Sequence, residues 1–353
     1  MGDFYTIGEA SKIIGVSEET LRRWDRNGKF KSSRHPINNY RVYTGEQLQL
    51  LEKRLQVKTK KTKNKKEVPP VLFLETEHGS LFQGDCLSLM KTIDSGSIDL
   101  IFADPPYNIK KAKWDCFKSD KEYLEWTKEW VKEAKRILSP CGNLYICGFP
   151  EILAEIKHEI SPLFYDCRWI VWYYRNKANL GNDWGRSHEG ILHLRKSKKH
   201  IFNIDLIRIP YNEHTTRYPE RSQGKSSQYD NGKSYNWTPN PLGAKPKDVL
   251  EIPTIANGSW EKYAHETQKP VELLRSIILS SSNEDSIIYD PFGGAGTTYA
   301  VAEAYGRKWI GSEKEDKYCQ IIKERVTDQA HLKRILDTKE EKLARERRLA
   351  LRK

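Results

Sequence analysis

The sequence has little cysteine, and none of its six cysteines in 353 residues forms a Cys-x-x-Cys pair. A zinc site built on paired thiols is therefore not expected, and no metal is predicted. Long hydrophobic runs are also lacking, because no segment approaches the roughly 20 apolar residues that cross a membrane. Residues 1–4 do not begin the basic and then apolar pattern of a secretion signal. We expect a cytoplasmic protein with no membrane partner.

Acidic residues are outnumbered, since 48 Asp and Glu stand against 60 Lys and Arg, for a net charge of +12. The surplus lies in three regions. Residues 1–70 carry 16 basic and 8 acidic residues, residues 195–247 carry 11 and 4, and residues 328–353 carry 9 and 5. Separate basic regions are typical of proteins that bind nucleic acid, because neutralising phosphates supplies most non-specific affinity. Solubility alone is the alternative explanation.

A short loop of unusual composition follows the apolar run at residues 98–103, which reads as a buried strand. The loop is Asp104-Pro105-Pro106-Tyr107. Two prolines end the strand and stiffen the chain beyond its carboxyl end, where ligands bind in open α/β sheets. A carboxylate, free carbonyls and an aromatic ring are what a flat base with an exocyclic amine requires. A strand-to-turn connection in which Tyr107 only packs is the alternative.

A second stretch has the layout of a nucleotide site. Residues 286–290 read as a buried strand, residues 291–298 as a Gly-rich turn and residues 299–305 as the start of a helix. No Lys follows the glycines, which excludes a phosphate-binding P-loop. Glu313 ends the next short strand, 17 residues after Gly296, close to the spacing of about 20 at which an acid accepts from ribose hydroxyls.

Together these residues resemble the amino-methyltransferases of DNA, which use S-adenosylmethionine. Asp104–Tyr107 matches the catalytic motif of that family and Phe292–Gly296 its cofactor motif. His265–Pro270, just before the cofactor strand, is similar to another of its motifs. The catalytic motif comes first, as in the beta-type order. The resemblance covers roughly residues 71–327 and implies an α/β fold with a Rossmann-like methyltransferase sheet.

The resemblance also implies the site residues. The catalytic group is Asp104, Pro105, Pro106 and Tyr107. The cofactor group is Asp85, Asp104, Lys269, Asp290, Phe292, Gly294, Gly296, Thr297 and Glu313. Asp85 ends a short predicted strand, and in the family such an Asp contacts the adenine of the cofactor. From the residues alone, a turn or helix-capping Asp at this position is equally plausible.

The reaction implied is direct methyl transfer to an exocyclic amine of a flipped base, with Asp104 and the Pro105 carbonyl accepting its N–H groups. Family members with Asp in the first motif position usually modify adenine at N6, and those with Ser modify cytosine at N4. Cytosine N4 stays an alternative, because both amines offer the same donors. The alternative from another class is a transcription regulator with an inactive methyltransferase fold.

A small separate domain is expected at residues 1–57. Thr6 and Glu9 form a capping box at its first helix, and the spacing of the next helix is that of a helix-turn-helix. Thr20–Trp24 and Tyr40–Tyr43 resemble the winged helix-turn-helix of MerR-type regulators, so we expect a small all-α winged domain. By that resemblance its second helix enters a major groove of DNA. The DNA-contacting residues expected here are Arg22, Arg23 and Arg41.

The remaining boundaries follow from composition. Residues 58–70 read as a Lys-rich linker and residues 328–353 as a basic C-terminal helix. The resemblance assigns residues 71–327, which lie between them, to the methyltransferase domain. Within the large domain, residues 195–263 lose regular periodicity and mix aromatic with basic residues, which suits target recognition. The DNA-contacting residues expected there are Arg217, Arg221, Lys225 and Lys233. Double-stranded DNA is the expected partner, and a cognate restriction endonuclease and a homodimer are further candidates.

Overall fold

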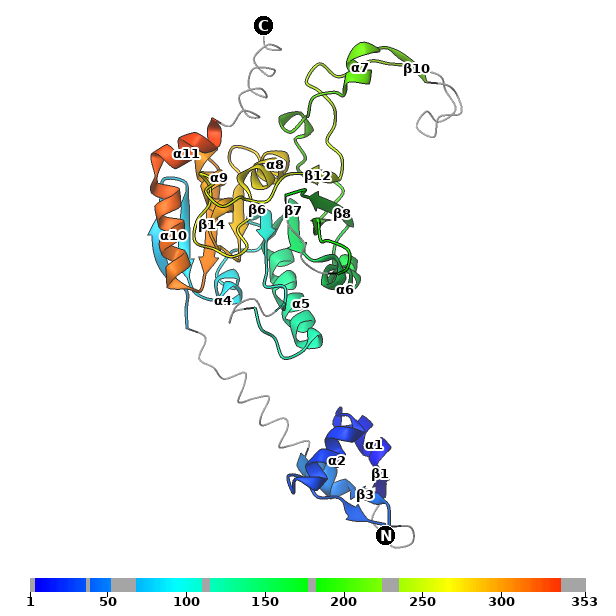
Figure 1. Cartoon of the computed structure of the whole chain (residues 1–353). Coiled ribbons are helices and arrows are strands. Elements are labelled where there is room, and N and C mark those ends of the chain that lie inside the picture. Colours follow the sequence, from blue (N-terminus) through cyan, green and yellow to red (C-terminus); the bar gives the residue numbers. More distant parts are fainter. Residues whose placement is uncertain are drawn as a thin grey trace. The chain divides into compact units, whose positions relative to one another are not determined.

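The structure, a computed structural model, describes residues 4–35, 39–51, 68–109, 115–176, 182–223 and 235–337. The chain divides into two compact units, Met1–Glu67 and Val68–Lys353. Their elements are labelled in Figure 1. Among the described residues, no helix has the length and apolar character needed to span a bilayer.

The small unit combines short helices with a three-stranded antiparallel sheet of order β1-β3-β2. Its elements are β1 (Phe4–Thr6), α1 (Ile7–Ile14), α2 (Glu18–Arg26), β2 (Ser33–Arg34), β3 (Arg41–Thr44) and a helix from residue 45 to at least residue 51. The predicted capping box is confirmed, since the Thr6 side chain and the Glu9 carboxylate each accept from the other residue's backbone N–H. The expectation of an all-α domain needs correction, because residues before the first helix pair with the predicted wing strand.

The large unit is built on a nine-stranded sheet of order β12-β8-β9-β7-β6-β13-β14-β5-β4. Its strands are β4 (Val71–Glu75), β5 (Gly79–Gln83), β6 (Ile98–Ala103), β7 (Leu138–Gly148), β8 (Asp166–Tyr173), β9 (His188–Arg195), β12 (Val249–Glu251), β13 (Ile287–Asp290) and β14 (Lys308–Glu313). The five central strands, β5, β14, β13, β6 and β7, run parallel. β9 runs antiparallel to β7 and brings its amino end to the carboxyl ends of that group.

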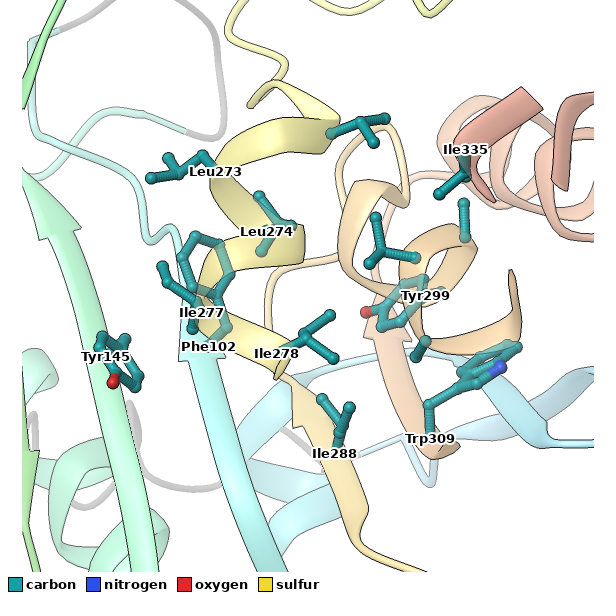
Figure 2. Close-up of a cluster of buried hydrophobic side chains, with 14 of the residues drawn as sticks. Phe102, Tyr145, Leu273, Leu274, Ile277, Ile278, Ile288, Tyr299, Trp309 and Ile335 are labelled. Carbon is teal, nitrogen blue, oxygen red and sulfur yellow. The ribbon is translucent and has the colours of Figure 1, made fainter. Parts of the chain in front are cut away.

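Helices cover both faces of this sheet. On one face lie α4 (Cys86–Met90), α5 (Asp120–Ile137) and α6 (Pro150–Ile160), and on the other α8 (Val271–Ser281), α9 (Thr297–Ala304), α10 (Asp316–Thr327) and α11 (Gln329–Leu336). Figure 2 shows the hydrophobic core between the sheet and the helices of the second face. Phe102 and Tyr145 of the sheet lie beside α8 there, and Tyr299 of α9 lies over Trp309. Strands covered on both faces read as continuous apolar runs, which explains why β6 was predicted with its observed bounds.

The two motif loops meet because of the sheet order. From β6 the chain goes on to β7 on one side, and from β13 it goes on to β14 on the other. β6 and β13 are neighbours, so the reversal falls between their carboxyl ends. In open α/β sheets this switch point is where ligands bind. The topology therefore places Asp104, which follows β6, beside the Gly-rich turn that follows β13.

One further local prediction differs from the structure. The short strand predicted to end at Asp85 ends instead at Gln83, because Asp85 accepts from the backbone N–H groups of Leu87 and Ser88 and so begins α4. In the basic, aromatic region, the described residues that follow β9 form short elements: η2 (Ile204–Leu206), α7 (Glu213–Arg217), β10 (Arg221–Gln223), β11 (Tyr235–Trp237) and β12. Lys225 and Lys233, the predicted linker from residue 58 to Glu67, and residues 338–353 lie outside the described residues.

Gly79→Ala is expected to destabilise the large unit by about 1–3 kcal/mol, the usual cost of overpacking. Gly79 pairs with Trp309 across β5 and β14, and an added Cβ would lie 2.1 Å from the indole. Trp309 is buried and donates to the Glu303 carboxylate at 2.6 Å, so it has little freedom to move. Denaturant unfolding measures the loss. In Gly79→Ala/Trp309→Leu the two costs should be less than additive, and strict additivity would refute the predicted clash.

Candidate active site

A cavity of about 470 Å³ lies where the loops after β6 and β13 meet. Most predicted site residues line it: Asp104, Pro105, Pro106, Tyr107, Lys269, Asp290, Phe292, Gly294, Thr297 and Glu313. Asp85 and Gly296 do not line it, although their neighbours Gly84, Cys86 and Ala295 do. The structure thus brings both motifs to one site, although Tyr107, the last residue of one, lies 185 positions before Phe292, the first residue of the other.

Asp104 is held by two side-chain donors. The Tyr107 hydroxyl donates to Oδ1 at 2.7 Å and the Lys269 ammonium donates to Oδ2 at 2.7 Å. Glu189 completes the group, because its Oε2 lies 3.1 Å from the Tyr107 hydroxyl and 3.5 Å from Lys269 Nζ. Charge-assisted hydrogen bonds of this kind are about twice as strong as neutral ones. They fix the orientation of the Asp104 carboxylate at the cavity wall.

Lys269 carries a buried positive charge, with only 6% of its surface exposed. Burial by itself lowers the pKa of Lys269, but the Asp104 and Glu189 carboxylates outweigh it and hold that pKa above its ordinary value. The charged ammonium form of Lys269 is therefore favoured. Its ring neighbours are Tyr107 and Trp172, with Nζ 5.4 and 5.9 Å from their centroids.

Sequence reasoning did not find Glu189. It is the one acid in the otherwise apolar and neutral or basic strand β9, which is a visible signal. Which end of β9 reaches the active site depends on its antiparallel pairing with β7, where Gly190 lies opposite Gly148. A strand assignment without the sheet order does not supply that information.

Aromatic rings form part of the cavity wall. Trp126 lies 5.1 Å from Phe117 and 5.7 Å from Phe292 between ring centroids, and all three line the cavity. The edge of Tyr107 contacts Phe149 with a centroid distance of 5.0 Å. Flat, apolar surfaces of this kind suit a heterocyclic ring as ligand.

The Gly-rich turn needs glycine for backbone conformation and for close packing. Gly294 and Gly296 have φ angles of 50° and 70°, in the left-handed region that side chains rarely adopt. A Cβ on Gly296 would also lie 2.8 Å from Ile322 of α10. Gly296 therefore shapes the turn from behind, while Gly294 presents its backbone to the cavity.

Glu313 and Asp85 sit at the carboxyl ends of neighbouring strands but play different parts. Glu313 accepts from the backbone N–H of Gly294 at 2.8 Å and lines the cavity. Burial raises the pKa of the Glu313 carboxyl. Asp85 caps α4 and pairs with Lys314 at 2.6 Å. The structure therefore shows the helix-capping role that was one of the alternatives for this residue. Its contact with a cofactor stays a prediction.

Asp290 ends β13 inside the protein. Burial raises the pKa of its carboxyl to about 8, and hydrogen bonds from the Thr298 hydroxyl and the Phe292 backbone N–H only partly oppose this. Thr297, at the start of α9, donates to the Lys269 carbonyl at 2.9 Å and accepts from buried Arg325 at 2.9 Å. These hydrogen bonds connect the Gly-rich turn to the segment that carries Lys269.

The predicted DNA-contacting residues have varied surroundings. Arg22 pairs with Glu18 at 2.8 Å and Arg41 with Asp25 at 2.7 Å, so internal ion pairs occupy both arginines. Arg23 on α2 and Arg217 at the end of α7 are exposed. For Arg221 the structure describes only the backbone, in β10. Among the described parts of the chain, no cluster of three or more His, Cys, Asp or Glu could hold a metal ion.

Comparison with known proteins matches both units. A family model described as DNA methylase matches residues 98–324, and one described as MerR family regulatory protein matches residues 6–43. The chain is 35% identical to Type II methyltransferase M1.MboII of Moraxella bovis, over 69% of this chain and 94% of that protein. It is 34% identical to DNA adenine methyltransferase YhdJ of Escherichia coli, over 72% of this chain and 85% of that protein.

The fold also has a solved counterpart. PvuII DNA methyltransferase, described as cytosine-N4-specific, superposes with a TM-score of 0.56 over 74% of this chain and 94% of that chain. Sequence identity is 18%, so this likeness concerns the fold alone. The expected methyltransferase sheet is thereby confirmed.

The buried Asp290 carboxyl predicts a pH dependence of stability. Between the ordinary pKa of 3.8 and the folded value of about 8, the folded protein keeps a proton that the unfolded chain releases. The free energy of unfolding should therefore fall as the pH rises through this window. Asp290→Asn does not titrate and should flatten that slope in denaturant titrations. Asp285→Asn, at an exposed turn nearby, serves as the control. A wild-type slope in Asp290→Asn would contradict the assignment.

Proposed function

The chain belongs to the DNA methylase family, whose methyl donor is S-adenosylmethionine, and we propose that it methylates the exocyclic N6 amine of adenine at specific sites in DNA. The observation that carries this proposal is the position of Asp104. It lines the same cavity as the Gly-rich turn and Glu313, with its carboxylate oriented by Tyr107 and Lys269. In this proposal, the hydrogen-bond acceptor for the amine of the target base therefore lies beside the site for a nucleoside-type cofactor.

The residues present fit this cofactor. Glu313 offers a carboxylate to ribose hydroxyls, and the Gly294 backbone permits close approach. Phe292 and Trp126 offer rings to a purine, and Lys269 offers a cation near the amino-acid part. Asp290, Gly296 and Thr297 would shape and support the turn, and Asp85 would act from the next strand. When bound, the cofactor supplies a methyl group on a positively charged sulfur.

The protein's part in the reaction is to bind and orient the amine. Asp104 would accept one N–H of the target base and the Pro105 carbonyl the other, which draws the nitrogen toward a tetrahedral geometry. Pro106 stiffens the loop, and the ring of Tyr107 would contact a base flipped out of the duplex. Holding nitrogen in line with the methyl carbon supplies much of the rate.

Adenine is preferred over cytosine because the first motif residue is Asp104. The similar proteins include one named as a DNA adenine methyltransferase, which supports the same choice. Cytosine N4 is the alternative acceptor. The assembled network around Asp104 speaks against a regulator with an inactive site, since a site without function has no reason to keep a buried Lys269 paired with two carboxylates.

The small unit is proposed as a second DNA contact, and its match to MerR-type regulators supports this role. Residues 195–263 are proposed to recognise the target, through Arg217, Arg221, Lys225 and Lys233. The resemblance of the chain to Type II methyltransferases favours a restriction endonuclease as biological partner. A homodimer and a cytoplasmic location complete the proposal.

Incubation of the protein with methyl-labelled S-adenosylmethionine and bacterial DNA should transfer label to DNA. Nucleoside digestion should place it in N6-methyl-2′-deoxyadenosine. Asp104→Ala should abolish transfer, because the amine loses its acceptor, while calorimetry still detects cofactor binding. Asp99→Ala, on the same strand but half-buried at a distance from the cavity lining, is the control. Label in N4-methyl-2′-deoxycytidine would select the alternative base, and an active Asp104→Ala variant would exclude the assigned catalytic loop.

Removing residues 1–67 should weaken DNA binding without changing the methylated sequence. The compact unit from Val68 onward contains the cavity and the proposed recognition region. Fewer phosphate contacts should make the dependence of affinity on salt shallower. Arg23→Ala should act in the same direction, whereas Lys12→Ala on α1 should act less. Affinity across salt concentrations and sequencing of methylated sites measure both. Methylation of a new sequence would show that the small unit takes part in target choice.

A further inference from the structure

The buried network at the active site carries an unbalanced charge. Asp104 and Glu189 contribute two carboxylates, Lys269 contributes one ammonium, and Tyr107 is neutral, which leaves one negative charge. We propose that Glu189 supplies this surplus charge. It favours the positively charged sulfonium cofactor over its uncharged product, and it then receives, through Tyr107, the proton that the methylated amine releases. The inference rests on the proposed function.

The geometry connects all four residues. The Tyr107 hydroxyl lies 2.7 Å from Asp104 Oδ1 and 3.1 Å from Glu189 Oε2, and its single proton can serve only one of them at a time. Lys269 Nζ lies 2.7 Å from Asp104 and 3.5 Å from Glu189. Glu189 and Lys269 are 9% and 6% exposed, so solvent screens their charges weakly.

Nearby titratable groups do not cancel the charge at neutral pH. The largest influence on each is burial, which raises the pKa of Asp290 to about 8 and holds the Cys147 thiol pKa well above its usual value. Burial likewise lowers the pKa of His265 to about 4, so this imidazole is neutral. Asp290 in its protonated form, Cys147 and His265 therefore add no charge. Of the other charged residues in the cavity wall, the cation Lys314 pairs with Asp85 at 2.6 Å and so does not offset the surplus, and Asp115, Glu313 and Glu315 are acids.

The surplus negative charge matches the charge of the ligands before methyl transfer and takes up the released proton after it. Before transfer, one negative charge on the protein balances one positive charge on sulfur. The amine then forms a bond to the methyl carbon as the carbon–sulfur bond breaks, with that electron pair left on sulfur. The positive charge is now on nitrogen, and it is removed when the N–H bond breaks. One proton on one carboxylate leaves the site neutral again.

The hydrogen bonds supply a path for that proton. It passes first from nitrogen to Asp104, the residue that would touch the amine. Asp104 then donates to the Tyr107 hydroxyl, which turns its own proton to Glu189. Asp104 regains its charge and its pairing with Lys269, so Glu189 acts through Tyr107 as a positioning and charge-balancing residue rather than by touching the substrate.

The test compares two ligands that differ by one methyl group and one charge, S-adenosylmethionine and S-adenosylhomocysteine. Calorimetry gives the ratio of their dissociation constants for each full-length variant. Glu189→Gln keeps the shape and the acceptor but removes the charge. It should lower the preference for the sulfonium about tenfold, the scale of a unit charge about 12 Å away at an effective dielectric constant of about 20. Contacts shared by both ligands cancel in the ratio.

A variant that changes the charge of the site in the opposite direction distinguishes a charge effect from a merely structural one. Lys269→Met makes the site more negative and should raise the preference for the sulfonium. Misfolding or loosening would shift both variants in the same direction. Glu151→Gln is the matched control, because Glu151 pairs with Arg186 at 3.0 Å but its side chain is 71% exposed, so the ratio should stay unchanged.

Tyr107→Phe tests the proton path through Tyr107 separately from the charge of Glu189. It removes the hydroxyl and keeps the ring, so the binding ratio should stay at the wild-type value while kcat falls by about 100-fold or more, the usual contribution of a positioned proton-transfer group. Glu189→Asp should restore part of the ratio. An unchanged ratio in Glu189→Gln, or shifts of one sign in Glu189→Gln and Lys269→Met, would overturn the inference. A wild type that binds neither ligand would instead remove the proposed function itself.

Discussion

The ion pair between Lys269 and Asp104 joins two segments that lie 165 residues apart and sets the geometry of the active site. A buried ammonium is costly unless carboxylates pair with it, so the position of Lys269 dictates where the loop after β6 must lie. The backbone of Lys269 is held in turn by Thr297, and Thr297 by Arg325. One buried charge thereby aligns the Asp104–Tyr107 loop with the Gly-rich turn.

This arrangement explains why the site contains more charge than methyl transfer to an amine requires. A carboxylate oriented by hydrogen bonds needs no reorganisation when the amine arrives, and a dry site makes its charge effective. The same burial would expel an unpaired carboxylate or ammonium. Lys269 offsets only one of the two carboxylates, Asp104 and Glu189, and in our proposal the remaining negative charge matches a cofactor that is itself positive. Stability of the empty site and affinity for the donor are therefore opposing demands on the same residues.

The small unit shows the limits of counting charges. A basic helix predicts DNA binding, and the match to MerR-type proteins agrees with it. Yet Arg22 and Arg41 form ion pairs within the unit, with Glu18 and Asp25. Whether an arginine faces a phosphate or a neighbouring carboxylate depends on packing between elements, and net charge does not report it. Arg23 keeps an exposed position for such a contact.

The order of residues alone determined the local features: the buried strand β6, the capping box at Thr6, the Gly-rich turn after β13 and the acid that ends β14. Each of these depends on neighbours within a few positions, where backbone sterics and hydrophobic periodicity act. Tertiary structure decided which of these features meet. Glu189 reaches Tyr107 because β9 runs antiparallel beside β7, and Lys269 becomes buried because α8 packs on β6. The active-site charge is a sum over distant segments, so only the folded sheet could define it.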